Sequence, residues 1–233
     1  MSEALSAPAY PTQALPRNRS AAPRPPVGSV RAPLLVAALL VLAMAIVWLV
    51  ATHVESARVR DAELLHRFWI AGGDRTNEVA RALVHMINPI QFTIWAVAIV
   101  LFALARARYR LALVIAVVLL LAPFSADVIK PLLGAPHVGF GQTIGPGSWP
   151  SGHATAATVL ALSAALVTPR RWRPLAYVLA GLFMLAIGVA LLVRLWHMPS
   201  DVLGGWLLGS LWITLAVAVL RAWEQRRPTA PAH

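Results

Sequence analysis

The chain has 233 residues, of which 59% are hydrophobic and only 12% are charged, and its mean hydropathy is +0.70. These values are typical of a membrane protein with several spans and exclude an ordinary soluble domain. The basic residues behind the net charge of +11 form short clusters between apolar runs, which argues against a nucleic-acid partner. The absence of cysteine excludes disulfides, thiolate ligands and a cysteine nucleophile.

Residues 1–31 are rich in Pro, Ser, Ala and Arg and have no apolar periodicity, so we predict a disordered basic tail. Residues 32–52 then carry no charge and are long enough to cross a bilayer core. We expect the membrane domain to cover residues 32–221, followed by a second basic tail over residues 222–233.

Residues 55–85 have mixed charge, helical spacing of apolar side chains and a break at Gly72-Gly73. This pattern favours two short amphipathic helices at the membrane interface, with a small soluble loop as the alternative. Further apolar runs cover about 86–105, 111–129, 151–167, 175–193 and 202–220. The predicted fold is therefore all-α, with six transmembrane helices and interfacial helices between the first and second spans. No pattern indicates an oligomeric state.

With six spans, both tails and the turns at 106–110 and 170–173 fall on one side, and all four are rich in arginine. By the positive-inside rule this side is cytoplasmic, which predicts an inner or plasma membrane protein with cytoplasmic termini. The segments 55–85, 134–149 and 194–201 then share the outer face with seven of the nine acidic residues. The loop 134–149 is long enough to suggest a function.

His197 lies four residues before Asp201, at the probable start of the last span. If a helix begins at Pro199, the carboxylate can reach the imidazole and fix its tautomer, which leaves the other ring nitrogen free as a nucleophile or base. The alternative is that Ser200 or Asp201 simply caps the helix.

The sequence Pro150-Ser151-Gly152-His153 has the residues of a helix start, whose exposed N–H groups bind anions such as phosphate. An ordinary cap beside a solvated histidine is the alternative. Lys130, the only lysine, and Arg194 lie near the same predicted rim and can supply positive charge to an anion. Their alternative is snorkelling at a helix end.

As a set, these motifs resemble the type 2 phosphatidic acid phosphatase superfamily of lipid phosphate phosphatases, which is related to the vanadium haloperoxidases. That family has a Lys followed after six residues by Arg-Pro, then Pro-Ser-Gly-His, then Ser-Arg with a His six residues after the Arg and an Asp four further on. Here the second motif is complete and His197 and Asp201 are in register. His137-Val138 replaces Arg-Pro, and Ala190-Leu191 replaces Ser-Arg.

The resemblance implies that His197 attacks phosphorus to form a phosphohistidine, that Asp201 orients it, and that His153 protonates the leaving group. It implies phosphate binding by Lys130 and by Ser151 and Gly152. We add Arg194, one helical turn from the usual arginine, and His137 as partial replacements. The substrate is then a glycerolipid or polyprenyl phosphate or diphosphate at the outer face, with no metal or cofactor.

Three other interpretations are compatible with the sequence. His137, His153 and His197 could together bind zinc, although their spacing is not that of paired ligands. A transferase that passes the phosphoryl or head group between lipids would use the same phosphohistidine. A non-catalytic protein that binds lipid phosphate with a degenerate site would account for the missing arginines.

Overall fold

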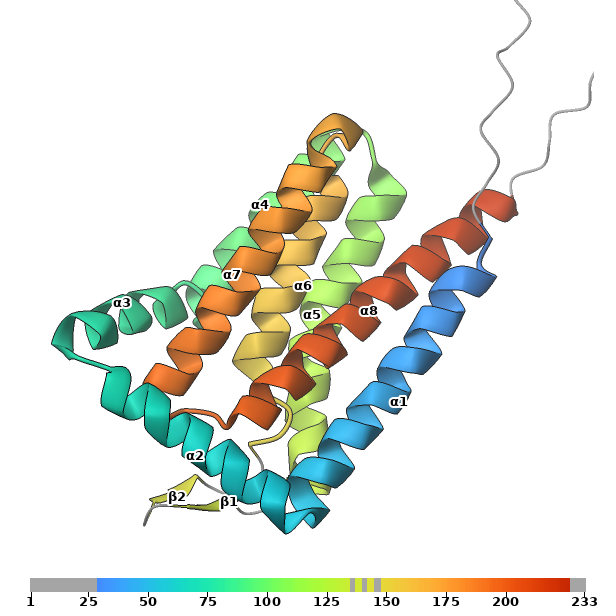
Figure 1. Cartoon of the computed structure of the whole chain (residues 1–233). Coiled ribbons are helices and arrows are strands. Elements are labelled where there is room, and N and C mark those ends of the chain that lie inside the picture. Colours follow the sequence, from blue (N-terminus) through green and yellow to red (C-terminus); the bar gives the residue numbers. More distant parts are fainter. Residues whose placement is uncertain (1–28, 135–136, 140–141, 145–147, 227–233) are drawn as a thin grey trace, which may run out of the picture.

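The computed structural model describes residues 29–134, 137–139, 142–144 and 148–226 and confirms the all-α class. The helices are α1 (Arg31–His53), α2 (Glu55–Ala71), α3 (Asp74–His85), α4 (Pro89–Ala105), α5 (Tyr109–Leu133), α6 (Gly152–Val167), the short 3₁₀ helix η1 (Arg170–Trp172), α7 (Arg173–Val193) and α8 (Pro199–Gln225). The apolar runs read from the sequence thus correspond to α1 and α4–α8 (Figure 1).

The long segment before α6, for which we expected only a loop, contains two short strands. Strand β1 (His137–Gly139) pairs antiparallel with β2 (Gln142–Ile144), and Val138 lies opposite Thr143. The β-branched residues Val138, Thr143 and Ile144 favour such pairing, but three residues per strand give almost no periodic pattern to detect.

Four helices, α1, α5, α8 and α7 taken together with η1, are long and apolar enough to cross a membrane. The pair α3–α4, bent by 52°, would be a fifth span. At 16 residues, α6 extends about 24 Å, less than the roughly 30 Å of a hydrocarbon core. The chain is therefore an integral membrane protein, while the number of six spans stays a prediction.

The predicted pair of amphipathic helices is present as α2 and α3, which are separated at Gly72-Gly73. Figure 1 shows α2 running across one end of the bundle, near the lower ends of α1, α7 and α8. The α2 helix packs against α1, α7, α8 and β1, and α3 packs against α7. The α2 helix therefore covers the end of the bundle at which α8 begins, and α3 flanks α7.

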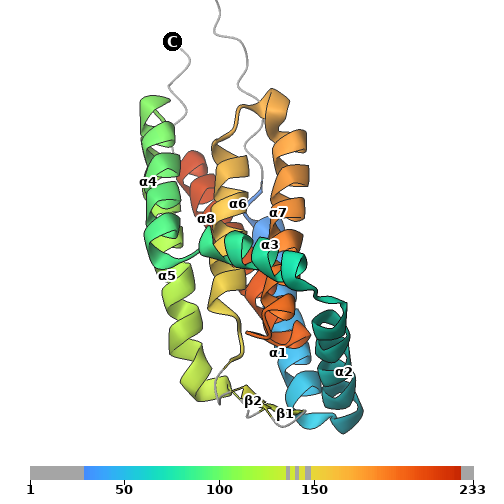
Figure 2. The ribbon, with the colours of Figure 1, turned by 90° about the vertical axis from the view of Figure 1, so that its left-hand side faces the viewer.

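The most enclosed helix is α6, which packs against α4, α5, α7 and α8 (Figures 1 and 2). The α1 helix packs against α8 and α2 at the edge of the molecule. At the other end of the bundle, the Arg221 side chain donates a hydrogen bond to the carbonyl of Ser29 at 2.9 Å. The first and last described segments therefore lie together, beside neither of the two histidine motifs.

Glycine allows α6 and α8 to approach each other closely. A Cβ on Gly205 would lie 2.5 Å from the carbonyl oxygen of Ser151, and one on Gly209 would lie 2.6 Å from Thr158 Cβ. This four-residue spacing of glycines is the kind that lets membrane helices pack backbone to backbone. Close packing at Gly205 places the start of α8 against the start of α6.

We expect Gly205→Ala to lower the melting temperature of the purified protein in detergent, because overpacking against a backbone carbonyl costs about 1–3 kcal/mol. Gly181→Ala, on α7, is the matched control, since a Cβ there meets nothing within 4 Å. It should raise the melting temperature slightly, because alanine is the better helix former. Equal melting temperatures for the two variants would contradict close α6–α8 packing.

Candidate active site

The two histidine motifs are joined by a backbone hydrogen bond. The N–H of Ser151 donates to the carbonyl of Asp201 at 3.0 Å, and both residues are fully buried. The Ser151 hydroxyl accepts a hydrogen bond from the N–H of Ala154 at 3.2 Å, so Ser151 is the N-cap of α6. The Ser151 side chain therefore caps α6, as the alternative interpretation predicted. The Ser151 backbone N–H also connects α6 to α8.

Asp201 lies behind His197 in the first turn of α8. Its Oδ2 atom is 3.5 Å from His197 Nδ1, within reach of an ion pair but longer than a typical hydrogen bond of about 2.9 Å. The same Oδ2 accepts a hydrogen bond from the N–H of Met198 at 2.9 Å. The carboxylate therefore caps the helix and faces the imidazole with one oxygen, so the two alternatives weighed from the sequence occur together.

The turn between α7 and α8 ends α7 with a pair of capping hydrogen bonds. Leu195 N–H donates to Leu192 O at 3.0 Å, and Trp196 N–H donates to Leu191 O at 3.1 Å. Leu195 has a φ of 55°, a left-handed conformation usually taken by glycine at this position. This reversal leaves only Trp196, His197 and Met198 before α8, which holds His197 at the junction.

His153 in the first turn of α6 faces the same junction. Its ring centroid is 6.5 Å from that of His197 and 5.5 Å from that of Trp196. His197 is 9% exposed, whereas His153 is half-buried. The structure thus brings the two predicted histidines to one level.

Lys130 near the end of α5 lies in a pocket that also contains His153. Its Nζ atom donates a hydrogen bond to Asp127 Oδ1 at 2.7 Å, and a Cβ on Gly152 would lie 3.4 Å from this Nζ. Lys130, Asp127, Gly152 and His153 line a pocket of about 290 Å³ whose remaining wall is formed largely by α4.

Arg194 lies at the edge of the site. Its guanidinium carbon is 5.9 Å from the centroid of Trp196, whose ring in turn faces His153. Leu191, at the position of the family's arginine, is fully buried in α7 and packs in the core. The backbone of His137 lies in β1, but its side chain is outside the part of the chain that the structure describes.

Two acidic residues of this region were not singled out from the sequence. Asp127 precedes Lys130 by three residues on α5, a spacing that places both on one helix face and is a signal that could have found it. Asp61 on α2 accepts two hydrogen bonds from Ser200, from its N–H at 3.1 Å and from its hydroxyl at 2.6 Å. Because 139 residues separate Asp61 from Ser200, no local pattern reveals this contact.

We expect Asp61→Ala to destabilise the protein, because the first turn of α8 then loses two hydrogen bonds at a partly buried position, a loss of about 1–3 kcal/mol. The measurement is the melting temperature in detergent. Glu63→Ala, an exposed carboxylate on the same helix, is the control and should leave it unchanged. If Asp61→Ala lowers the melting temperature equally in wild type and in Ser200→Ala, the hydrogen bond from the Ser200 hydroxyl contributes nothing.

The comparisons with known proteins agree with this arrangement. Residues 111–225, which contain all the described site residues, match the family model of the PAP2 superfamily. The complete Pro150-Ser151-Gly152-His153 motif and the His197–Asp201 pair lie within the matched residues. The C-terminal half of the chain therefore matches the PAP2 superfamily, as its motifs predict.

A solved structure shares the fold. The crystal structure of a transmembrane PAP2-type phosphatidylglycerolphosphate phosphatase from Bacillus subtilis superposes with a TM-score of 0.68. The two sequences are 20% identical, and the match covers 84% of this chain and 98% of that one. No curated protein matches the chain. The chain thus has the fold of this PAP2-type membrane protein.

Proposed function

We propose that the protein is an integral-membrane phosphatase that hydrolyses a lipid phosphate or diphosphate through a phosphohistidine on His197. The observation that carries this proposal is the facing pair of imidazoles, 6.5 Å apart, with a buried carboxylate behind one of them. The match to the PAP2 superfamily supports the reaction class. The lipid is a glycerolipid or polyprenyl phosphate or diphosphate.

His197 is the nucleophile. With Asp201 Oδ2 facing its Nδ1, the Nε2 atom is left to attack phosphorus. The attack forms an N–P bond and breaks the bond between phosphorus and the lipid oxygen. The carboxylate of Asp201, held by the Met198 N–H, stabilises the positive charge that develops on the ring.

His153 is the general acid. The His153 ring lies across from the His197 ring and is half-buried beside Trp196. From there it can give a proton to the departing lipid oxygen. Once neutral, the same ring accepts a proton from water, which attacks the phosphohistidine. The N–P bond then breaks, inorganic phosphate is released and His197 is restored.

Lys130 and the start of α6 hold the phosphoryl oxygens. The first N–H groups of a helix have no intrahelical acceptor, and Gly152, at the start of α6, lies beside Lys130 Nζ. The Ser151 N–H is bonded to Asp201, so Ser151 contributes mainly by placing this turn. Arg194 adds positive charge from the edge, and His137 from β1 is a further candidate. Such fixed positive charge is the main means of catalysis in phosphoryl transfer.

The pocket is suited to a phosphate with an apolar tail. Phe92 and Thr93 on α4 line both the site pocket and a second groove of about 320 Å³ between α4 and α5. The second groove is lined by apolar residues of the two helices. A lipid tail lying in this groove would bring its phosphate to Lys130 and His153.

Three alternatives make different predictions for the same preparation. A transferase releases little phosphate unless water is the acceptor, and a binding protein forms no phosphohistidine. In the described residues no three His, Asp or Glu side chains lie close enough to hold a metal ion. The side chain of His137 is outside the described part, so a zinc site that includes it is tested by chelation.

We expect purified wild-type protein in detergent with a chelator to release phosphate from at least one of phosphatidic acid, phosphatidylglycerolphosphate and a polyprenyl diphosphate. His197→Ala should lower the rate by about a thousandfold or more, because the nucleophile is lost. His153→Ala should lower it by about 10²–10⁴-fold, the usual contribution of general acid–base catalysis. Inorganic phosphate is the quantity measured.

His53→Gln serves as the control, since His53 is exposed at the end of α1 and contacts only Thr52 and Trp48 among the described residues. It should retain the wild-type rate. Acid quenching of a radiolabelled reaction should trap phosphate on wild type and not on His197→Ala. Unchanged rates in both catalytic variants would exclude this mechanism, and loss of wild-type activity on chelation would support the metal site instead.

We further propose that both termini are cytoplasmic and that the site faces the outside of the inner or plasma membrane. In Figure 1 the arginine-rich turns, the start of α1 and the end of α8 lie at one end of the bundle. The starts of α6 and α8, which carry the site, lie toward the other end. The positive-inside rule assigns the arginine-rich end to the cytoplasm. Residues 29 and 226, the first and last that the structure describes, also lie at this end.

A reporter that is active only in the cytoplasm, fused after His233, should be active, because the arginine-rich end is retained there. A reporter fused into the turn at Gly72-Gly73 should be inactive in the same cells. Activity of a periplasmic reporter at His233 would reverse the assigned orientation.

A further inference from the structure

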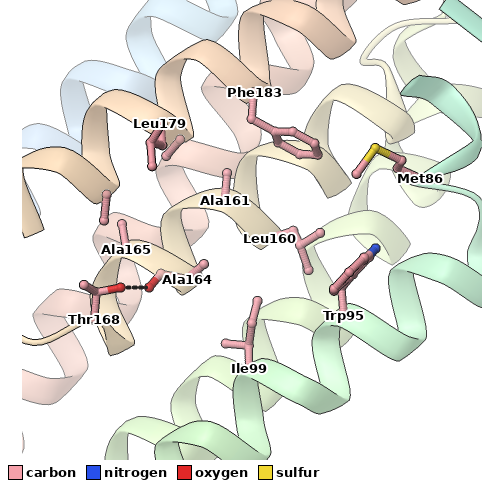
Figure 3. A pocket seen from close by; sticks show the side chains of 12 residues that line it. Met86, Trp95, Ile99, Leu160, Ala161, Ala164, Ala165, Thr168, Leu179 and Phe183 are labelled. Carbon is pink, nitrogen blue, oxygen red and sulfur yellow. Dashed lines mark hydrogen bonds between the residues drawn. The ribbon is translucent and has the colours of Figure 1, made fainter. Parts of the chain in front are cut away.

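Another groove, different from the one between α4 and α5, lies away from the proposed active site, between α4, α6 and α7. Its volume is about 360 Å³, and its floor on α6 is made of small residues that include Ala161 and Ala164. Figure 3 shows Trp95, Ile99 and Phe183 on its two sides. None of its lining residues lines the site pocket. A hollow of this size on the apolar face of a membrane protein is filled by an acyl chain, because water finds no polar partners there.

The groove ends at Thr168, where two arginines converge. Arg173 donates from Nε to the carbonyl of Thr168 at 3.2 Å and from its terminal nitrogen to the carbonyl of Leu166 at 3.1 Å. Arg108 donates to the same Leu166 carbonyl at 3.3 Å and to that of Val167 at 3.1 Å. Both guanidiniums therefore stand at the C-terminus of α6, directly beside the end of the groove.

Two further arginines complete what we call the arginine cluster: Arg106, Arg108, Arg170 and Arg173. Burial lowers the pKa of Arg108 first, and repulsion from the other three members of the cluster lowers it further. The side chains of Arg106 and Arg170 are exposed. Capping of α6 accounts for Arg108 and Arg173, but not for Arg106 and Arg170 beside them.

We propose that the arginine cluster and the groove between α4, α6 and α7 form a binding site for an anionic phospholipid. The phosphate of the head group lies on the cluster, and one acyl chain lies in the groove against Ala161 and Ala164. Basic clusters next to helix ends attract anionic lipids in this way. The site is separate from the proposed phosphatase pocket, and the phosphodiester lipid it holds is not a substrate for monoester hydrolysis.

The test uses the full chain in phosphatidylcholine bilayers that contain spin-labelled phosphatidylglycerol or spin-labelled phosphatidylcholine. Electron spin resonance gives the fraction of motionally restricted lipid and hence the relative association constant. Wild type should prefer phosphatidylglycerol. Arg106→Gln with Arg170→Gln should lower this preference by about fivefold for each arginine removed. Ala164→Leu, which fills the groove, should lower the restricted fraction of phosphatidylglycerol.

Each variant has a matched control. Arg58→Gln with Arg60→Gln removes two exposed arginines from α2 and should keep the preference. Gly181→Leu adds the same bulk on α7 where nothing lies within 4 Å of the new Cβ, and should keep the restricted fraction. The proposal is overturned if wild type shows no preference, if the cluster variant keeps it, or if the α2 variant loses as much. Phosphate release by wild type is measured separately and has no bearing on this result.

Discussion

The hydrogen bond from the Ser151 N–H to the Asp201 carbonyl is the contact on which the site depends. It joins the first turn of α6 to the first turn of α8, fifty positions apart in the chain. The close approach at Gly205 makes this bond possible, because any side chain there would meet the Ser151 carbonyl. Because both helix starts are fixed to each other, the two histidines next to them have a fixed separation.

The Asp201 carboxylate also has two roles in the structure. One carboxylate oxygen accepts the Met198 N–H and faces His197 Nδ1, so the cap of α8 and the orientation of the imidazole depend on each other. Asp61 adds a second connection by holding Ser200 from α2. A helix that lies across the end of the bundle thereby stabilises the turn that carries the nucleophile, although it contributes no group to the chemistry.

The sequence predicted the helices and the proximity of His197 to Asp201, for physical reasons that apply locally. The apolar runs predicted the positions of α1 and α4–α8, and the spacing of His197 and Asp201 predicted that their side chains lie close together. The contacts of Asp61 with Ser200, and the placement of Lys130 against Gly152, depend on packing between distant segments. Such contacts leave no periodic pattern. The structure also shows that the Ser151 N–H donates its hydrogen bond to the Asp201 carbonyl, which a tetrapeptide motif alone cannot reveal.

The shortness of α6 follows from its place in the bundle. Only a helix that faces lipid must match the thickness of the hydrocarbon core, and α6 is surrounded by α4, α5, α7 and α8. Its last carbonyls are instead satisfied by Arg108 and Arg173, and its first turn is joined to α8 by Ser151. Both of the polar sites proposed for this protein therefore lie at the ends of one short helix, the histidines at its start and the arginine cluster at its end.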